Sequence, residues 1–353
     1  MRPDPHNASF AVLGAWLDRI DPGTHRRVKG LRLATAYGLA AMLATTPALA
    51  EGRETLLGVL AAGFALWASV SEGQSTRYRS ARDLLILCLA AGIGASLFAV
   101  LQPVLGPRWD ELTLVTGAFC VGYLKRYGVL GAGVGSQIFI GQLLAFTSGA
   151  TLRDLGTIAL AVSLAGLASV VPRMLSGPAE KPALSPSADT PADGDVAFTE
   201  MIMGLQAASA SLVIAVLGQM LGLTESAWAI AACTYVVTGS LAGTVDRIRR
   251  RVAGTLVGVP LGLACLPVAA HMPLVVWVMA AIAIIIYAMA LPEHYEIACG
   301  AYAFALVVTM GASGEYPVAV LVARGWETIL GGAIGIAVVL LFAKLPFVRQ
   351  HEC

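Results

Sequence analysis

Charged side chains are scarce in this chain of 353 residues. Asp, Glu, Lys and Arg make up 13% of it, whereas a soluble domain has about 25%. Hydrophobic residues make up 57%, and the mean hydropathy is +0.76. So few polar side chains cannot cover the surface of a water-soluble fold. The net charge of +1 also provides no basic field, so we expect no nucleic-acid partner.

Motifs that mark an enzyme or a metal site are missing as well. The six cysteines are scattered and form no C-x-x-C pair, which argues against a zinc site and a disulfide framework. The sequence has no P-loop, no H-E-x-x-H and no G-x-S-x-G, the patterns that serve phosphate binding, zinc proteolysis and acyl transfer. We therefore predict no enzyme activity and no cofactor or metal. Active transport by this chain must then draw on an ion gradient or a partner protein.

Long apolar runs, in contrast, are abundant. Many approach the roughly 20 residues that a helix needs to cross a bilayer. We predict an all-α polytopic membrane protein of about twelve transmembrane helices, with the lipid bilayer as its first partner. The candidate spans are residues 31–50, 54–72, 83–105, 111–124, 129–149, 154–175, 200–222, 226–243, 252–270, 272–291, 295–313 and 325–344.

A polar segment divides these spans into two groups of six. Residues 176–198 are rich in Pro, Ala, Ser and Asp, a composition typical of a flexible linker. Near the N-terminus, residues 8–20 place apolar side chains on one helical face, which fits an interfacial helix or a plain cytoplasmic tail. The predicted order is a cytoplasmic segment (1–29), a six-helix half (30–175), a cytoplasmic linker (176–198), a second six-helix half (199–345) and a cytoplasmic tail (346–353).

The positions of lysine and arginine predict the orientation. If the N-terminus is cytoplasmic, 19 of the 23 Lys and Arg residues fall on the cytoplasmic side. The other four are Arg53, Arg108, Arg153 and Arg324. Such a bias marks the cytoplasmic face of a membrane protein, so both termini are predicted there.

The two halves resemble each other as a parallel repeat. In the first half, Arg153 precedes Thr157-Ile158. In the second half, Arg324 precedes Thr328-Ile329, and each of these residues lies 171 positions after its counterpart. Six helices per half is an even number, so both halves share one orientation across the membrane. We therefore expect them to be related by an axis along the membrane normal.

The most specific pattern is a group of arginines that runs directly into a glycine-faced helix. It reads Arg247-Ile-Arg-Arg-Arg251-Val-Ala-Gly254-Thr255-Leu-Val-Gly258 and follows a helix that contains Trp228. A second string, R-x-x-E-T-I-L-G-G, covers residues 324–332. With these motifs the chain resembles the fusaric acid resistance and aromatic acid exporter family, whose superfamily includes plant aluminium-activated malate transporters. Residues 205–345 carry most of the resemblance, and the first half matches mainly by topology.

The resemblance implies a transporter in a bacterial inner membrane. The first hypothesis is an exporter of small organic acids, in particular aromatic ones, that is driven by the proton gradient. In Gram-negative members a periplasmic adaptor protein assists such an exporter. A passive anion channel and a non-transporting membrane scaffold are the alternatives. Many members carry a large cytoplasmic domain, whereas this chain has only the linker. The family motif marks helix packing, so it assigns no substrate-binding residue.

Candidate residues for the pathway of an organic anion are therefore cations at the span ends and polar groups within spans. For Arg82 and Arg251 the alternative is that they only mark the cytoplasmic ends of helices. For Arg153 and Arg324 the alternative is a structural ion pair, with Asp154 and Glu327 respectively. The glutamines and tyrosines equally fit hydrogen bonds between helices. The pathway candidates are Arg82, Gln137, Gln142, Arg153, Arg251, Tyr302, Arg324 and Glu327, with Tyr235 and Tyr287 beside them. The predicted helix-packing residues are Gly254, Thr255, Gly258, Gly262, Gly331 and Gly335.

Overall fold

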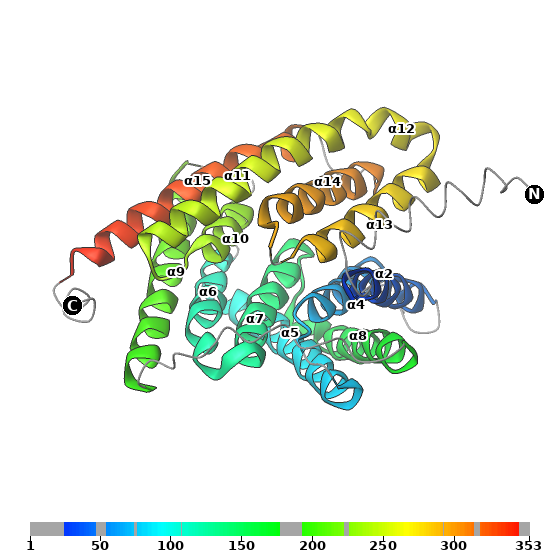
Figure 1. Cartoon of the computed structure of the whole chain (residues 1–353), viewed down its shortest axis with the longest axis horizontal. Helices are drawn as coiled ribbons and strands as arrows, with labels where there is room; N and C mark the ends of the chain where they lie inside the picture. The colour runs from blue at the N-terminus through cyan, green and yellow to red at the C-terminus, as the bar shows by residue number, and fades with distance from the viewer. Residues whose placement is uncertain are drawn as a thin grey trace, which may run out of the picture.

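The computed structural model of the chain is built from helices joined by short connections (Figure 1). It describes residues 25–46, 54–73, 76–106, 108–176, 193–221, 226–291, 293–313 and 318–345. Over these ranges the structure contains helices and turns but no strand, which confirms the predicted all-α class.

The first helix set contains six α-helices and three short 3₁₀ turns. It comprises α2 (His25–Ala44), α4 (Glu54–Val70), α5 (Arg77–Leu105), η1 (Asp110–Leu112), α6 (Thr113–Tyr123), η2 (Leu124–Tyr127), α7 (Gly128–Thr147), η3 (Leu152–Asp154) and α8 (Leu155–Leu175). The interfacial helix expected at residues 8–20 lies outside the described residues.

Over the described residues, the second helix set contains seven α-helices, of which α12 is only six residues long. It comprises α9 (Asp193–Leu221), α10 (Ser226–Val236), α11 (Leu241–Ala264), α12 (Leu266–His271), α13 (Pro273–Ala290), α14 (Tyr295–Ser313) and α15 (Val318–Ala343). Residues 193–198 of the expected linker are helical at the start of α9. The expected tail at 346–353 is outside the described residues.

One helix boundary differs clearly from the sequence expectation. The span predicted at 226–243 is helical only to Val236, and Gly239 has a φ of 87°, a value that favours glycine. A new helix, α11, begins at Leu241, where the Ser240 side chain accepts a hydrogen bond from the Gly243 amide. Arg247 and Arg251 thus lie inside α11, because the serine cap starts the helix before the apolar run.

Six helical stretches of the described residues are long and apolar enough to cross a membrane: 77–105, 110–147, 152–175, 198–221, 241–268 and 325–343. The second of these contains both α6 and α7. Shorter apolar helices cover 55–70, 226–236, 275–290 and 295–311. The chain is a multi-pass membrane protein, while the number of twelve spans stays a prediction.

Helix pairing follows the same scheme in both sets. In the first set, α5 packs against α7 and α8, and α4 packs against α2 and α8. In the second set, α11 packs against α14 and α15, and α10 packs against α9 and α15. Between the sets, α6 contacts α9 and α2 contacts α13. Figure 1 shows α11 and α15 along one edge and the first set below them.

Small residues stand at the closest helix contacts. A Cβ atom on Gly258 of α11 would overlap the backbone of Gly300 on α14, and one on Gly331 of α15 would overlap the backbone of α10. In the first set, a Cβ on Gly141 of α7 would overlap the backbone of Ala91 on α5. Such contacts let helices approach closely where lipid removes the hydrophobic driving force. Gly254 and Gly262 also face α14, Gly335 lies near Val236 of α10, and Thr255 is buried on α11.

Candidate functional site

Arg251 of α11 lies among tyrosine side chains. Its Nη1 atom donates a hydrogen bond of 3.4 Å to the hydroxyl of Tyr295 on α14. Its charge also interacts with Tyr302 and Cys299, further along α14. The Nε atom is buried and has no hydrogen-bond acceptor among the described residues. The guanidinium group therefore keeps donor capacity in a part of the molecule that is sheltered from water.

Aromatic rings from both helix sets meet beside this arginine. The ring centroid of Trp67 on α4 lies 5.3 Å from that of Tyr302 and 6.2 Å from that of Tyr287 on α13. Tyr287 and Tyr302 are 5.7 Å apart. These separations are within the range of favourable aromatic pairs. The first set contributes the tryptophan and the second set contributes the tyrosines.

Tyr235 of α10 makes a second connection between the sets. Its hydroxyl is 2.8 Å from the hydroxyl of Ser136 on α7, and its ring centroid is 5.7 Å from that of Phe139 on the same helix. Tyr235 also interacts electrostatically with Arg251 and Tyr302. The contact of Tyr235 with α7 and the contact of Trp67 with Tyr302 therefore lie around the same arginine. We call Arg251, Trp67, Tyr235, Tyr287, Tyr295 and Tyr302 the arginine–aromatic cluster.

The arginine–aromatic cluster has the chemistry to hold an aromatic carboxylate. A guanidinium group pairs with a carboxylate through parallel N–H donors, and tryptophan and tyrosine rings pack against an aromatic body. The low dielectric constant of a buried site strengthens the charge pairing relative to water. An ionisable residue within a membrane helix is a functional candidate on these grounds.

Most of this cluster falls within a region that matches a known protein family. Residues 212–338 match the model of a family described as fusaric acid resistance protein-like. The match confirms the resemblance predicted from the arginine and glycine motifs. No curated protein and no solved structure matches the chain. The fusaric acid resistance protein-like region runs from within α9 to within α15 and contains every member of the cluster except Trp67.

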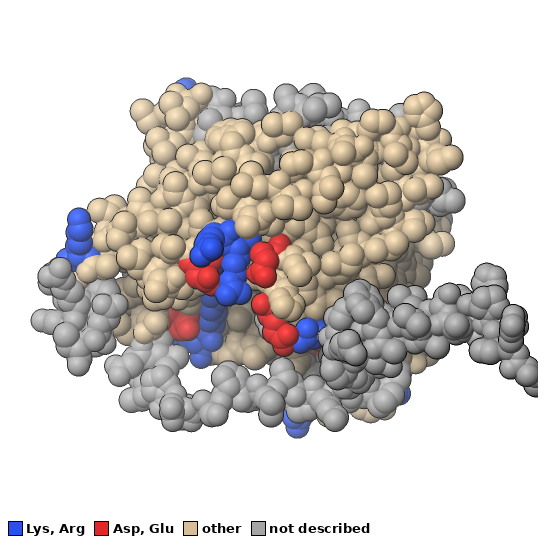
Figure 2. Space-filling model, turned by 45° about the horizontal axis from the view of Figure 1, so that its top comes forward, with Lys and Arg blue, Asp and Glu red and all other residues tan. Residues whose placement is uncertain are grey.

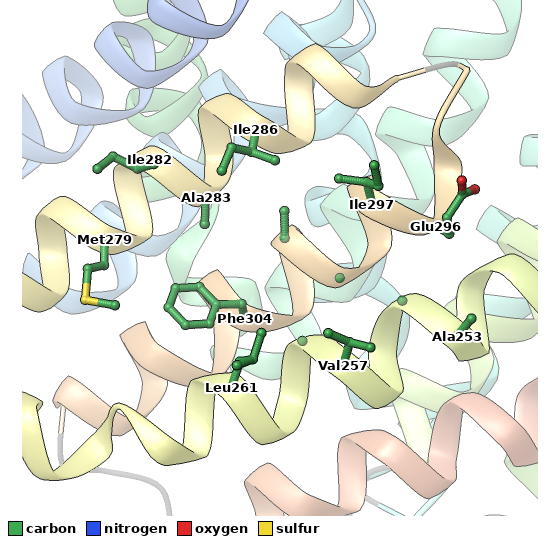
Figure 3. A pocket seen from close by; sticks show the side chains of 14 residues that line it. Ala253, Val257, Leu261, Met279, Ile282, Ala283, Ile286, Glu296, Ile297 and Phe304 are labelled. Atoms are coloured by element: carbon green, nitrogen blue, oxygen red, sulfur yellow. The ribbon is translucent and has the colours of Figure 1, made fainter. Parts of the chain in front are cut away.

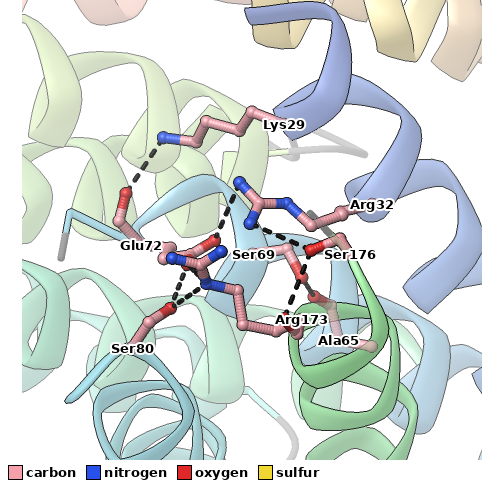
Figure 4. Close-up of polar contacts among 8 residues, drawn as sticks. All are labelled: Lys29, Arg32, Ala65, Ser69, Glu72, Ser80, Arg173 and Ser176. Atoms are coloured by element: carbon pink, nitrogen blue, oxygen red, sulfur yellow. Dashed lines mark hydrogen bonds and ion pairs between the residues drawn. The ribbon is translucent and has the colours of Figure 1, made fainter. Parts of the chain in front are cut away.

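A separate group of buried charges lies in the first helix set, outside the fusaric acid resistance protein-like region (Figure 4). Arg173 of α8, which is 1% exposed, has its Nε atom 2.7 Å from Glu72 Oε1 and 2.8 Å from Ser80 Oγ. Lys29 Nζ donates to the backbone carbonyl of Glu72 at 3.0 Å. Arg32 Nη2 is 4.0 Å from Glu72 Oε2. These contacts join the ends of α2, α4, α5 and α8.

Sequence reasoning missed this group. It treated Arg32 and Arg173 as markers of orientation, because a positive charge near a span end has that meaning by default. Arg32 stands at the very beginning of the predicted span 31–50, beside the other basic residues of the N-terminal segment, so nothing in the sequence set it apart. Trp67 and Tyr295 were likewise not predicted as site residues, since nothing local distinguishes them from packing residues.

The structure separates the predicted cations. Arg82 is exposed and pairs with Asp83, with its Nη2 atom 2.9 Å from Oδ1. Arg153 is exposed on η3 and has no ion pair among the described residues. Asp154 instead accepts hydrogen bonds from the backbone amide and hydroxyl of Thr151, at 2.8 and 2.7 Å, in a capping box. Of these cations only Arg251 belongs to the arginine–aromatic cluster.

The remaining predicted residues lie elsewhere in the helix packing. Gln142 of α7 donates to the hydroxyl of Thr116 on α6 at 2.8 Å. Gln137 donates to the hydroxyl of Ser71, just after α4, at 3.4 Å. Both side chains are fully buried, so each links neighbouring helices. Glu327 of α15 is buried, and the side chain of Arg324, one turn earlier, is outside the described part of the chain.

Proposed function

We propose that this protein transports small organic acids with an aromatic ring across a bacterial inner membrane, in the direction of export. The observation that carries the proposal is the arginine–aromatic cluster in a multi-pass membrane protein. Arg251 supplies the charge for a carboxylate, and the surrounding rings supply a surface for an aromatic body. The fusaric acid resistance protein-like match supports the same substrate class.

We also propose that twelve spans form two parallel six-helix repeats. The shared pairing scheme supports this arrangement. When the six-residue helix α12 is left out of the count, the third helix of each set contacts the fifth and the sixth, and the second contacts the first and the sixth. The contacts between the sets are also reciprocal, because the fourth helix of each contacts the first helix of the other. A site at the junction of two repeats is where relative movement of the halves changes access.

Export against a concentration gradient needs an energy source. The sequence has no P-loop, so the proposed source is the proton gradient, with a periplasmic adaptor protein as a candidate partner. We propose that both termini lie in the cytoplasm, in agreement with the distribution of lysine and arginine. The substrate would then enter from the side of the membrane on which the arginines of α11 begin.

Counterflow in proteoliposomes tests the proposal, with radiolabelled 4-hydroxybenzoate as the probe. Arg251→Gln is expected to lower uptake about tenfold, the effect of losing one hydrogen bond to a charged group. Arg251→Lys, which keeps the charge, should restore part of the uptake. Arg79→Gln is the control, because Arg79 is exposed on α5, which contains no residue of the arginine–aromatic cluster. Thermal unfolding of each variant verifies that it is folded.

The outcomes separate the functional classes. Uptake that rises with an imposed pH gradient supports a proton-driven exporter. Flux that ignores the pH gradient and follows voltage contradicts the exporter and indicates an anion channel. A folded wild-type protein without flux contradicts transport of this substrate class, and equal losses in Arg251→Gln and Arg79→Gln contradict the assigned site.

A further inference from the structure

An apolar groove lies on the outer face of the second helix set, between α11 and α13 and above α14 (Figure 3). Its volume is about 600 Å³. Val257 of α11, Ile286 of α13 and Phe304 of α14 are among the side chains that line it. Val257 is 60% exposed. The groove faces outward, unlike the arginine–aromatic cluster, and its apolar lining is suited to hydrocarbon.

The dimensions of the groove match one lipid leaflet. On α11 its lining extends from Ala253 to Leu261, which is about 12 Å at a rise of 1.5 Å per residue. One leaflet of a bilayer contributes about 15 Å of hydrocarbon, half of the 30 Å core. The groove is therefore short enough for one acyl chain to span it within a single leaflet.

Charged residues gather at one end of the groove. Arg250 precedes Val257 by seven residues on α11, and this spacing places both on one helical face. Arg250 Nε is 3.0 Å from Asp246 Oδ2, and its Nη1 is 3.9 Å from Oε2 of Glu296. Figure 2, with the α11 and α15 edge turned toward the viewer, shows basic and acidic side chains gathered in one group near the middle of the face, and fewer charges around it.

Two groups at this end have unused capacity for a ligand. Glu296 lines the groove with a side chain that is 41% exposed, and its Oε2 atom accepts no hydrogen bond among the described residues, although Arg250 Nη1 lies 3.9 Å from it. Arg249 is exposed and makes no ion pair within the described part of the chain. A carboxylate oxygen that can still accept a hydrogen bond and an arginine without an ion pair in the described ranges thus lie at the same end of α11 as the groove.

We propose that the groove is a binding site for a phospholipid with an ethanolamine headgroup. One acyl chain lies between α11 and α13, the phosphate pairs with Arg249 and Arg250, and the primary ammonium donates a hydrogen bond to Glu296. A choline headgroup has no N–H donor for this carboxylate. A glycerol headgroup brings no positive charge to Asp246 and Glu296. Of the three headgroups, only ethanolamine therefore offers both a phosphate to the arginines and N–H donors to Glu296.

Native mass spectrometry of the purified full chain tests this proposal. Phosphatidylethanolamine, phosphatidylglycerol and phosphatidylcholine with identical acyl chains are added separately. One phosphatidylethanolamine is expected to be retained about tenfold more tightly than the other two, the effect of a charge-assisted hydrogen bond. Glu296→Gln should remove that preference. Val257→Trp, which fills the groove, should abolish retention of all three lipids.

Ile93→Trp is the matched control for the groove variant. Ile93 is 61% exposed on α5, away from the groove, so the variant adds the same bulk to another apolar face and should leave retention unchanged. Equal retention of the three lipids, or retention that Val257→Trp leaves intact, overturns the proposal. A dimer that Val257→Trp dissociates, without bound lipid, overturns it in favour of a second copy of the chain. None of these results depends on transport activity.

Discussion

At the scale of single residues, burial gives the arginines of this chain different roles. Arg173 is held by Glu72 and Ser80 within the first helix set, so its charge joins helix ends. Removal of one partner from such a buried pair typically costs about 3–5 kcal/mol. Arg251 instead interacts with tyrosines of the second set, and one of these, Tyr302, packs against Trp67 of the first set. That position suits a ligand whose binding depends on how the two sets are arranged.

An exposed ion pair gives a prediction about pH. Arg26 Nη2 donates to Glu293 Oε1 at 2.5 Å, and this guanidinium holds the pKa of Glu293 below its ordinary value. Because the folded state lowers the pKa, the contact stabilises the fold fully above the ordinary glutamate pKa of about 4.3. Its contribution is lost as the pH falls through the lowered pKa.

Thermal unfolding of the wild type and Glu293→Gln at a series of pH values measures this effect. The difference between their midpoints should be small but constant near neutral pH, since the pair is exposed and screened by solvent. It should shrink as the pH falls below about 4.3. A difference that stays the same down to the lowest pH at which the protein is folded contradicts the prediction.

At the scale of elements, helix contacts in the second set depend on positions without a side chain. The backbone of α11 approaches that of α14 at Gly254 and Gly258, where no Cβ atom fits. Both glycines belong to the motif that resembles the family. Other helical glycines, such as Gly156 on α8, have open space in the Cβ direction. The motif therefore marks a specific contact between two helices.

Alanine substitutions at two glycines test this distinction. Gly258→Ala should lower the free energy of unfolding by about 1–3 kcal/mol, because the added methyl group overpacks the α11–α14 contact. Gly156→Ala is the control and should be neutral or stabilising by up to about 1 kcal/mol, the helix propensity difference between glycine and alanine. Unfolding in detergent measures both. Equal effects at the two positions would show that the contact is not tight.

At the scale of the whole molecule, the pairing of helices and the distribution of lysine and arginine describe two different relationships. The pairing scheme relates one helix set to the other, and the charge bias relates both to the membrane. The reciprocal contacts of α6 with α9 and of α2 with α13 place the first helix of each set on the fourth helix of the other. Two sets related in this way provide the inter-set position occupied by the arginine–aromatic cluster.

Cysteine labelling tests the proposed orientation. In a cysteine-free background, Ser148→Cys follows α7 and His294→Cys precedes α14, both outside the helices. With twelve spans and cytoplasmic termini, Ser148→Cys should react with a membrane-impermeant maleimide in intact cells. His294→Cys should react only after the membrane is opened. Labelling of both positions from the same side would contradict the proposed topology.

The sequence alone was sufficient to predict an all-helical membrane protein and its fusaric acid resistance protein-like region. Hydropathy and the spacing of small residues are local properties of the sequence. A helix that crosses lipid must have an apolar run of sufficient length, and helices that pack closely must have small residues at their contact. The approximate positions of the helices were predicted for the same reason. Arg251 and Tyr302 were among the predicted residues because a cation at the end of a span and a polar group within a span are visible in the sequence.

Only the tertiary structure brought Trp67 of α4 to Tyr302 of α14, and Glu72 to Arg173. These partners are far apart in the chain, and no local pattern specifies which faces of two helices meet. The early end of α10 also depended on structure, because an apolar run does not reveal a break at Gly239. The lipid environment requires that membrane helices be long and apolar, and this requirement is visible in the sequence. Which helices contact each other depends on side-chain packing between distant parts of the chain, which becomes visible only in the folded structure.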